Sequence, residues 1–269
     1  MVVSRIAPAR GILNPAVAET RFQMNHYFPA SDLSHLVLRY WIIRWDLRGQ
    51  ESYTQELLTY PCLNLVIEAG QSALYGVETQ KSSHTLEGCG TVLGVKFRPG
   101  GFYPFFKRSI SELTNRALPL SDVFGIDSAS LEAAILSSAA DGHRVTLVED
   151  FLRQRLPPPD ENVTLVNQIV DAINAERAIT RVDHVACRFH MSRRTLERLF
   201  SQYVGVSPKW VIQRARLHEA AEKLARDEKV DLPRLALDLG YFDQAHFIKD
   251  FKTIIGTTPG DYARRAGTG

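Results

Sequence analysis

The feature that most restricts the fold is an internal repeat near the C-terminus. Residues 192–208, SRRTLERLFSQYVGVSP, align without a gap with residues 243–259, DQAHFIKDFKTIIGTTP. Each copy begins with a residue that favours a helix N-cap, Ser192 or Asp243. A repeated pattern of this length predicts two copies of one supersecondary unit.

Start and stop signals agree within each copy. Gly205 and Gly256 are C-cap signals, and the pairs Ser207-Pro208 and Thr258-Pro259 are typical of the start of another helix. Apolar residues recur at helical spacing before each glycine, which predicts one buried stripe per copy. The stripes consist of Leu196, Leu199 and Phe200 in the first copy and Phe247, Phe251 and Ile254 in the second.

A shorter helix is predicted upstream of each copy, in RVDHVACRFHM and in DLPRLALDLGYF. Ala186 and Ala236 are small enough for two helices to pass closely, and Gly240 provides a turn residue. The pattern indicates a helix-turn-helix that occurs twice. A duplicated helical bundle with no nucleic-acid role has the same patterning and remains an alternative.

The polar faces of the repeated helices favour DNA. With Leu196 in the core, a spacing of 100° per residue places Arg194, Glu197 and Arg198 on the outer side. In the major groove, arginine can donate two hydrogen bonds to guanine and glutamate can accept from cytosine. The second helix exposes Ala245 and Ile248, which suit the thymine methyl group, together with the two basic residues Lys249 and Lys252.

Charge and prolines divide the chain into two parts. Three consecutive prolines in RLPPPDEN interrupt a helical pattern, and we expect separate cores on either side. We predict an N-terminal domain over residues 1–156, a linker over 157–162 and a C-terminal domain over 163–269. The C-terminal domain has 17 Lys and Arg against 13 Asp and Glu, whereas the rest has 15 against 17. This asymmetry is compatible with a phosphate-bearing partner.

The C-terminal part resembles the AraC/XylS class of bacterial transcription regulators over about 100 residues. The segment LALDLGYFDQAHFIKDFKTIIGTTPGDYARR carries the resemblance. Its matching positions, in the expected order, are Ala236, Gly240, Phe247, Phe251, Lys252, Gly256, Pro259 and Tyr262. The resemblance implies seven helices: one leading helix over 163–176, two helix-turn-helix units and a long helix that joins them.

The resemblance also implies where the bases are contacted. The implied base contacts are Arg194, Glu197 and Arg198 in the first unit and Gln244, Ala245, His246 and Lys249 in the second. Ala245 replaces a polar residue often found in the family, which weakens the expected readout by the second helix. A phosphate contact or helix packing is an equally good interpretation of His246.

Phosphate contacts are expected from helix N-termini and flexible basic side chains. The candidates are Arg193, Thr195, Lys209, Lys252, Arg264 and Arg265. The expected partners are double-stranded DNA and RNA polymerase, with a small-molecule effector and a homodimer as further expectations. Activation and repression remain equally open.

The N-terminal half contains short runs rich in Val, Ile, Tyr and Trp, bounded by Gly, Pro or Asn. They predict a β-rich, barrel-like domain over about 25–98, followed by helices near 101–106, 109–115 and 130–156. The fold class is therefore α+β, with an all-α C-terminal domain. Family members commonly carry an effector or dimerisation domain in this position, and GVKFRPGGFYPFF resembles a segment of uncharacterised regulators of the class.

Other functions find little support in the sequence. Hydrolase, kinase and dinucleotide motifs are absent, so we expect no catalytic residues and no cofactor. An enzyme or a DNA-repair protein with an attached DNA-binding module is the alternative, but Cys62 fits a buried strand residue better than a reactive thiol. His26, His35 and His84 lack the close spacing of a metal site. We expect no signal peptide, no membrane span and a cytoplasmic location.

Overall fold

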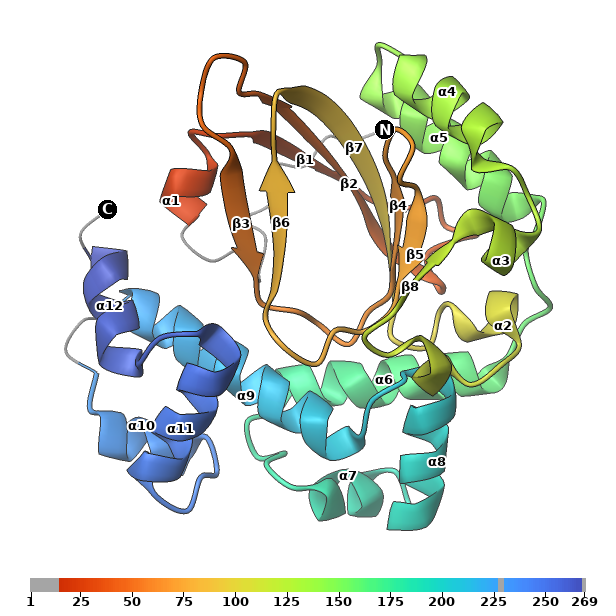
Figure 1. Ribbon diagram of the computed structural model, residues 1–269. Coiled ribbons are helices and arrows are strands. Elements are labelled where there is room, and N and C mark those ends of the chain that lie inside the picture. The colour runs from red at the N-terminus through yellow and green to blue at the C-terminus, as the bar shows by residue number, and fades with distance from the viewer. Residues whose placement is uncertain (1–14, 227–229, 268–269) are drawn as a thin grey trace.

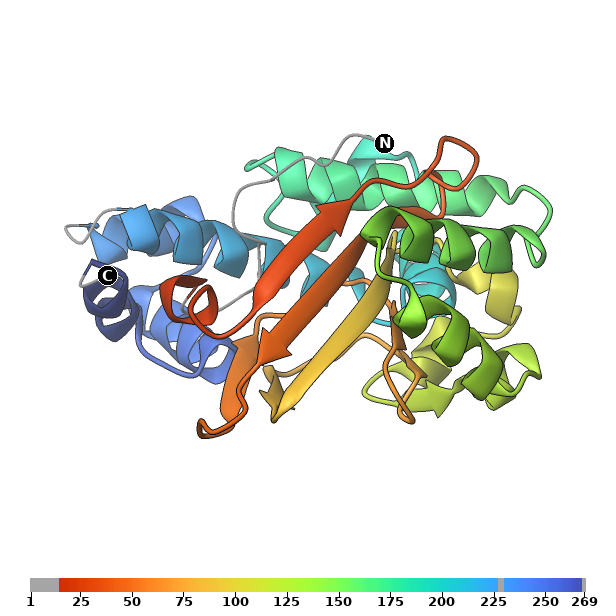
Figure 2. The ribbon, with the colours of Figure 1, turned by 90° about the horizontal axis from the view of Figure 1, so that it is seen from above.

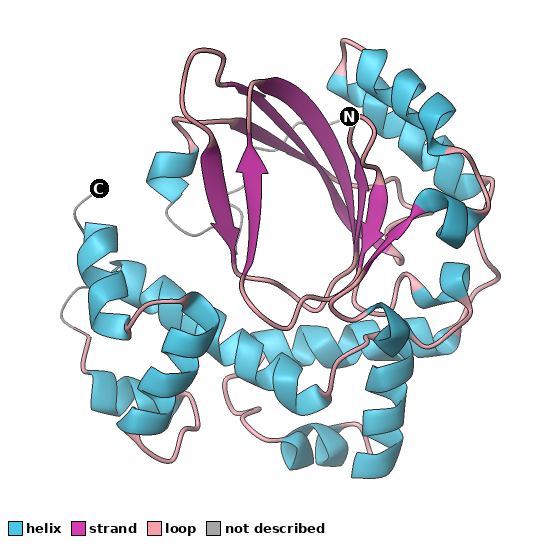
Figure 3. Ribbon diagram, viewed as in Figure 1, coloured by secondary structure: helices cyan, strands magenta, loops and turns pink. Residues whose placement is uncertain are grey.

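The computed structural model describes residues 15–226 and 230–267, with strands in the N-terminal part and helices in the C-terminal part (Figures 1 and 3). The strands are β1 (Gln23–Tyr27), β2 (Val37–Asp46), β3 (Tyr53–Leu57), β4 (Asn64–Ile67), β5 (Ala73–Tyr75), β6 (Ser82–Leu86), β7 (Cys89–Phe97) and β8 (Ala117–Pro119). The α+β class predicted from the sequence is confirmed.

Six strands form one antiparallel sheet in the order β1-β2-β7-β4-β5-β8, and β3 pairs with β6 in a separate ribbon. Figure 2 shows the long strands β1, β2 and β7 side by side. Because side chains alternate along a strand, the sheet has two distinct faces. Tyr40 and Ile42 of β2 are buried against the helices, whereas Arg39 and Trp41 point to the opposite face.

Helices follow β7 near the predicted positions, but strand β8 and the helix Leu120–Phe124 among them were not predicted. A short helix α1 (Pro15–Ala18) precedes β1, and after β7 come α2 (Tyr103–Phe106), the 3-10 turn η1 (Ile110–Leu113), α3 (Leu120–Phe124), α4 (Ser128–Ser137) and α5 (Asp141–Arg153). The single helix predicted near 130–156 is wrong, because the chain is extended at Ser138 and Ala140 and two helices form instead.

The C-terminal part contains seven helices within the described residues, the number implied by the resemblance. They are α6 (Glu161–Ala175), α7 (Val182–Arg188), α8 (Arg193–Tyr203), α9 (Pro208–Arg226), α10 (Leu232–Asp238), α11 (Gln244–Ile255) and α12 (Pro259–Gly267). The first of them begins at Glu161 because Asp160 caps it, accepting a hydrogen bond from the Asn162 amide at 2.9 Å.

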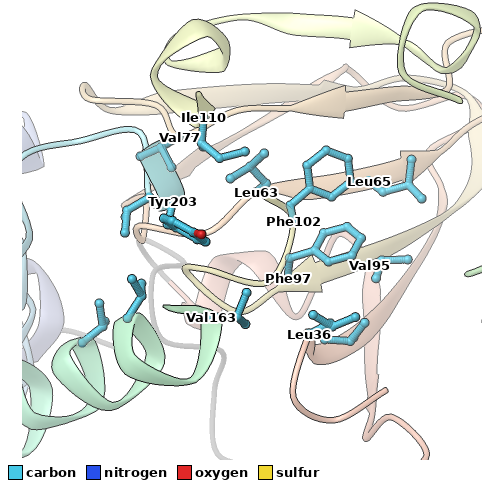
Figure 4. Packing of buried hydrophobic residues seen from close by; sticks show 14 of the residues in the cluster. Leu36, Leu63, Leu65, Val77, Val95, Phe97, Phe102, Ile110, Val163 and Tyr203 are labelled. Carbon is cyan, nitrogen blue, oxygen red and sulfur yellow. The ribbon is translucent and has the colours of Figure 1, made fainter. Parts of the chain in front are cut away.

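The hydrophobic core does not divide at the prolines. One cluster of buried residues runs from Tyr27 in the sheet through Val163 of α6 and Tyr203 of α8 to Ile212 of α9. Figure 4 shows side chains of β7, α6 and α8 in this cluster. A second cluster contains Phe247, Phe251 and other side chains of the last helices. The expectation of separate cores on either side of the proline run is therefore wrong, although the domain boundaries themselves remain a prediction.

Polar contacts also join α8 to the N-terminal part. The rings of Tyr103 and Tyr203 lie 4.1 Å apart, and the Gln202 side-chain amide donates to the Tyr103 hydroxyl at 2.6 Å. Burial raises the pKa of Tyr203 to about 12. The Thr114 hydroxyl donates to the carbonyl of Gly205 at 2.6 Å, at the end of α8. Contacts of this kind hold the first helical unit against the strand domain.

Candidate nucleic-acid interface

Two helix-turn-helix units are present: the first unit consists of α7 and α8, and the second unit of α10 and α11. We call α8 and α11 the reading helices. Their predicted N-caps are confirmed, since Ser192 accepts from the Thr195 amide at 3.1 Å and Asp243 accepts from the His246 amide at 2.7 Å. Gly256 is the C-cap residue of α11, with a φ of 89°.

The turns of the two units are built alike but differ in length. In each, the amide of the third residue of the turn donates to the carbonyl of the small residue in the first helix, Met191 to Ala186 and Tyr241 to Ala236, both at 3.0 Å. Four residues separate α7 from α8, whereas five separate α10 from α11. The repeat therefore has an offset of 50 in the first helices and of 51 in the reading helices.

The first reading helix presents the predicted polar face. Leu196 and Phe200 are fully buried, while Arg194, Glu197 and Arg198 are exposed. Within the described part of the chain, neither of these two arginines forms an ion pair or a side-chain hydrogen bond. Their guanidinium groups are therefore available to a partner outside the chain.

The candidate side chains of the second reading helix are less exposed than those of the first. Phe247 is fully buried, and Ala245 and Lys249 are exposed, whereas Gln244 is only partly exposed. His246 lies at the flank: its ring meets Tyr241 edge-on at 5.2 Å, and its Nε2 lies 3.4 Å from a carboxylate oxygen of Asp250. These contacts favour the packing interpretation of His246.

The candidate phosphate contacts differ in what already surrounds them. Lys209 and Lys252 are exposed. Arg193 forms an ion pair with Asp183 of α7 that lowers the pKa of the carboxyl group, so a phosphate would have to compete with this pair. The Thr195 hydroxyl shares a hydrogen bond with the Ser192 hydroxyl, and Arg264 forms an ion pair with Asp261. The side chain of Arg265 lies outside the described residues.

Two exposed apolar side chains in the second unit were not singled out from the sequence. Phe242, in the turn before α11, is 90% exposed, and Leu237 of α10 is 59% exposed. A groove between the two units is lined by Phe242 together with Lys209 of α9. An apolar residue directly before an N-cap commonly packs back onto its own helix, so the sequence carried no signal for the exposure of Phe242.

Buried arginines fix the long helix α9, and these too were missed. Arg214 is 1% exposed, and it donates to the Thr59 hydroxyl at 3.0 Å and to the Thr79 carbonyl at 3.2 Å. Its guanidinium also lies 4.7 Å from the ring centre of Trp210. Burial lowers the pKa of Arg214 to about 10. The strand domain therefore contacts the helix that joins the two units.

A second candidate site is a cavity of about 250 Å³ in the strand domain. It lies between the outer face of the six-stranded sheet and the β3–β6 ribbon, and its lining includes Trp41, Arg39 and Lys96. His26 and His84 also line it. Among the described residues, no group of three His, Cys, Asp or Glu side chains could hold a metal ion.

Residues 185–265 match a family model described as a helix-turn-helix domain, and residues 25–119 match a domain of unknown function (DUF6597). The C-terminal part is an AraC-type helix-turn-helix domain. Relatives of this AraC-type domain include the activator RclR of Escherichia coli (strain K12), 34% identical over 84 residues that cover 31% of this chain and 29% of RclR. The activator NphR of Rhodococcus sp is 25% identical over 211 residues, which cover 78% of this chain and 54% of NphR.

The chain spans about a quarter to a third of the length of the first curated relatives it matches. Among solved structures, ToxT of Vibrio cholerae has a TM-score of 0.40 and 10% identity, and the match covers 91% of this chain and 98% of ToxT. The curated relatives are named as transcription regulators or activators.

The surroundings of Cys62 bear on the repair alternative. The side chain is buried, as predicted, but it lies two residues before β4 rather than within a strand. Burial raises the pKa of the Cys62 thiol. A thiol that accepts an alkyl group reacts as the thiolate, which this environment disfavours.

Among the helices of the described residues, none is both long enough and apolar enough to cross a membrane.

Proposed function

We propose that the chain is a sequence-specific DNA-binding transcription regulator that reads two adjacent major-groove segments with α8 and α11. The observation that carries the proposal is the pair of capped helix-turn-helix units, in which the exposed basic residues Arg198 and Lys249 occupy equivalent positions of the reading helices. In such a unit the second helix enters the major groove, and its side chains contact the base edges.

The two reading helices have different roles in this proposal. Arg194 and Arg198 of α8 donate to guanine, and Glu197 accepts from cytosine. On α11, Lys249 and Gln244 are the polar readers, and Ala245 lies against a thymine methyl group. His246 contributes a phosphate or packing contact. The phosphate contacts, which set register rather than sequence preference, come from Arg193, Thr195, Lys209, Lys252 and Arg264.

The length of α9 supports simultaneous reading of two grooves. Its 19 residues span about 28 Å at 1.5 Å per residue. Successive major-groove segments on one side of DNA recur about every 34 Å. The side chains of the reading helices cover the difference, assisted by slight bending of the DNA, which costs on the order of a few kcal/mol over a short site.

Control through the strand domain completes the proposal. The strand domain contacts α9 through Arg214 and encloses a cavity large enough for a small molecule. RNA polymerase, a small-molecule effector and a second copy of the chain are the proposed further partners, and the cytoplasm is the proposed location.

The test is selection of bound sequences from a random pool of double-stranded DNA by the full chain. We expect enrichment of one asymmetric motif with two boxes. The variant R194A/R198A should lose the preference in one box only, whereas R48A, which removes an exposed arginine from the far end of the sheet, should enrich the same motif as the unchanged chain. No enrichment, with a folded protein, would support a helical bundle that has no nucleic-acid role.

A further inference from the structure

The cavity of the strand domain is lined by one face of the six-stranded sheet. Arg39 of β2 lies directly opposite Lys96 of β7, and Lys96 lies opposite Asn64 of β4, so their side chains emerge on the same face. All three line the cavity. His26 of β1 lines it as well, and its buried Nδ1 accepts no hydrogen bond and donates none within the described structure.

This end of the cavity is cationic and lacks a counter-ion. Among the described residues, neither Arg39 nor Lys96 forms an ion pair. Burial lowers the pKa of Lys96 to about 8, which still leaves its amine mostly protonated at pH 7. Burial and the two neighbouring cations lower the pKa of His26 to about 4, so His26 is neutral there. Two partly buried positive charges without an acidic partner favour an anion from outside the chain.

The carboxylates of the cavity lie elsewhere. Glu68 follows β4 at the end opposite Asn64, four residues or about 13 Å along the strand, and its oxygen lies 3.9 Å from Nε2 of His84. Glu78 lies in the loop after β5, where its carbonyl accepts from the Thr59 hydroxyl. Neither carboxylate is among the charges that act on Lys96, so the cationic end keeps its net positive charge.

The remainder of the cavity is largely apolar and aromatic. The indole of Trp41 lies across β7 at Gly94, where a Cβ atom would come within 1.9 Å of the ring, so only glycine is accommodated at that position. Ile43, Leu57 and Tyr75 line the walls. A dry cavity of about 150 Å³ is enough to bind benzene, so 250 Å³ accommodates a body of roughly naphthalene size.

One wall of the cavity is also the contact with α9. Thr59 and Tyr60 line the cavity, and both touch α9: Thr59 through Arg214, and Tyr60 through His218, whose ring is stacked at a centroid distance of 4.0 Å. The Tyr60 ring also lies 4.6 Å from the Lys96 amine. Leu58, the residue before Thr59, is buried in the core of the second unit. Contacts through Tyr60 therefore link Lys96 in the cavity to His218 on the helix between the units.

We propose that the cavity binds a small carboxylate with an apolar or aromatic body, its anionic group between Arg39 and Lys96, and that its binding is transmitted to α9 through Tyr60. An anion draws the Lys96 ammonium away from the Tyr60 ring, and this weakens the cation–π contact that holds the ring against His218. The ligand class rests on the cavity alone, whereas the consequence for DNA rests on the proposed function.

The first experiment measures binding of 2-naphthoate and of its neutral counterpart 2-naphthol to the full chain by calorimetry. We expect naphthoate to bind at least tenfold more tightly than naphthol. The variant K96M should lose this preference and still bind naphthol, and R48A should behave as the unchanged chain. Equal affinity for the two probes, or a naphthoate affinity that K96M does not alter, would overturn the ligand class.

The second experiment separates binding from transmission. Naphthoate should change the hydrogen exchange of the amides of α9 and, where the chain binds DNA, its DNA affinity by at least fivefold. In H218L, which removes the stacked ring on α9 and leaves the lining of the cavity unchanged, naphthoate should still bind within about threefold of the original affinity, and both responses should disappear. Because hydrogen exchange needs no DNA, an altered exchange without DNA binding refutes the proposed function and not this coupling. Unaltered exchange in the unchanged chain, or a full response in H218L, refutes the coupling.

Discussion

Substituting one glycine in each helix-turn-helix unit tests whether the first unit is fixed against the strand domain. Gly205 and Gly256 occupy equivalent positions of the repeat, just after the reading helices, and their φ values are 90° and 89°. Any other residue is strained at such a φ, so G205A and G256A both lose stability for this reason. The surroundings of the two positions differ.

The difference in lost stability between G205A and G256A can be estimated from the atoms around each glycine. At Gly256, a Cβ atom would meet only the Lys81 amine, 2.9 Å away at the end of a flexible side chain. At Gly205, it would lie 2.9 Å from the backbone carbonyl oxygen of Ile110 and 3.0 Å from the Thr114 hydroxyl. Backbone strain costs about 1–2 kcal/mol in both variants. Overpacking against η1 adds about 1–3 kcal/mol in G205A alone.

Native-state hydrogen exchange measures the free energy of opening of each unit separately, which matters because the second unit has its own core. We expect G256A to lower the opening free energy in α11 by about 1–2 kcal/mol and G205A to lower it in α8 by about 2–5 kcal/mol. Equal losses would mean that the carbonyl of Ile110 does not limit the position of α8, and that the first unit is not fixed against the strand domain.

Three further outcomes are expected. The variant R198A should weaken operator binding by about 1–3 kcal/mol and relax the preference at one base pair, which selection from a random pool detects. The variant K252A should instead weaken all sequences alike and reduce the slope of affinity against salt by about one, as measured by salt titration; equal loss of specificity in both variants would contradict this division. In the folded chain the pKa of His26 is lowered from 6.5 to about 4, so between these pH values the unfolded chain binds a proton that the folded chain does not. The free energy of unfolding should therefore fall as the pH drops through this range. Replacing His26 with Gln should flatten that fall in urea unfolding curves, and an unchanged pH dependence would contradict it.

Local signals explain which parts of the fold were predictable. Caps and turns depend on a few neighbouring residues, so Ser192, Asp243 and Gly256 could be assigned from the sequence and are confirmed. The partner of an apolar stripe is not a local property. Tyr203 is buried against Tyr103, a residue one hundred positions away, and nothing in the spacing of α8 distinguishes that partner from another helix.

The same distinction applies to the sites. The exposed face of α8 follows from helical periodicity, so Arg194 and Arg198 were identified as candidates. The pairing of Arg193 with Asp183 depends on the geometry of the turn between them and was not predicted. In the strand domain, alternation in LRYWIIRW places Arg39 on one face with Trp41, and this was the available signal for the cavity. The position of Arg39 opposite Lys96 could not be predicted without knowing that β2 pairs with β7.

The most direct test of two-groove reading is footprinting of the full chain on a selected operator, combined with spacer insertions. One chain should protect two boxes about 10 to 10.5 base pairs apart in an asymmetric site. Inserting five base pairs between the boxes should remove most of the specific affinity, because the second box then faces the other side of the DNA. Inserting ten should not restore it, because α9 cannot lengthen. Protection of a single box, or affinity that survives the five-base-pair insertion, would show that α11 does not read DNA.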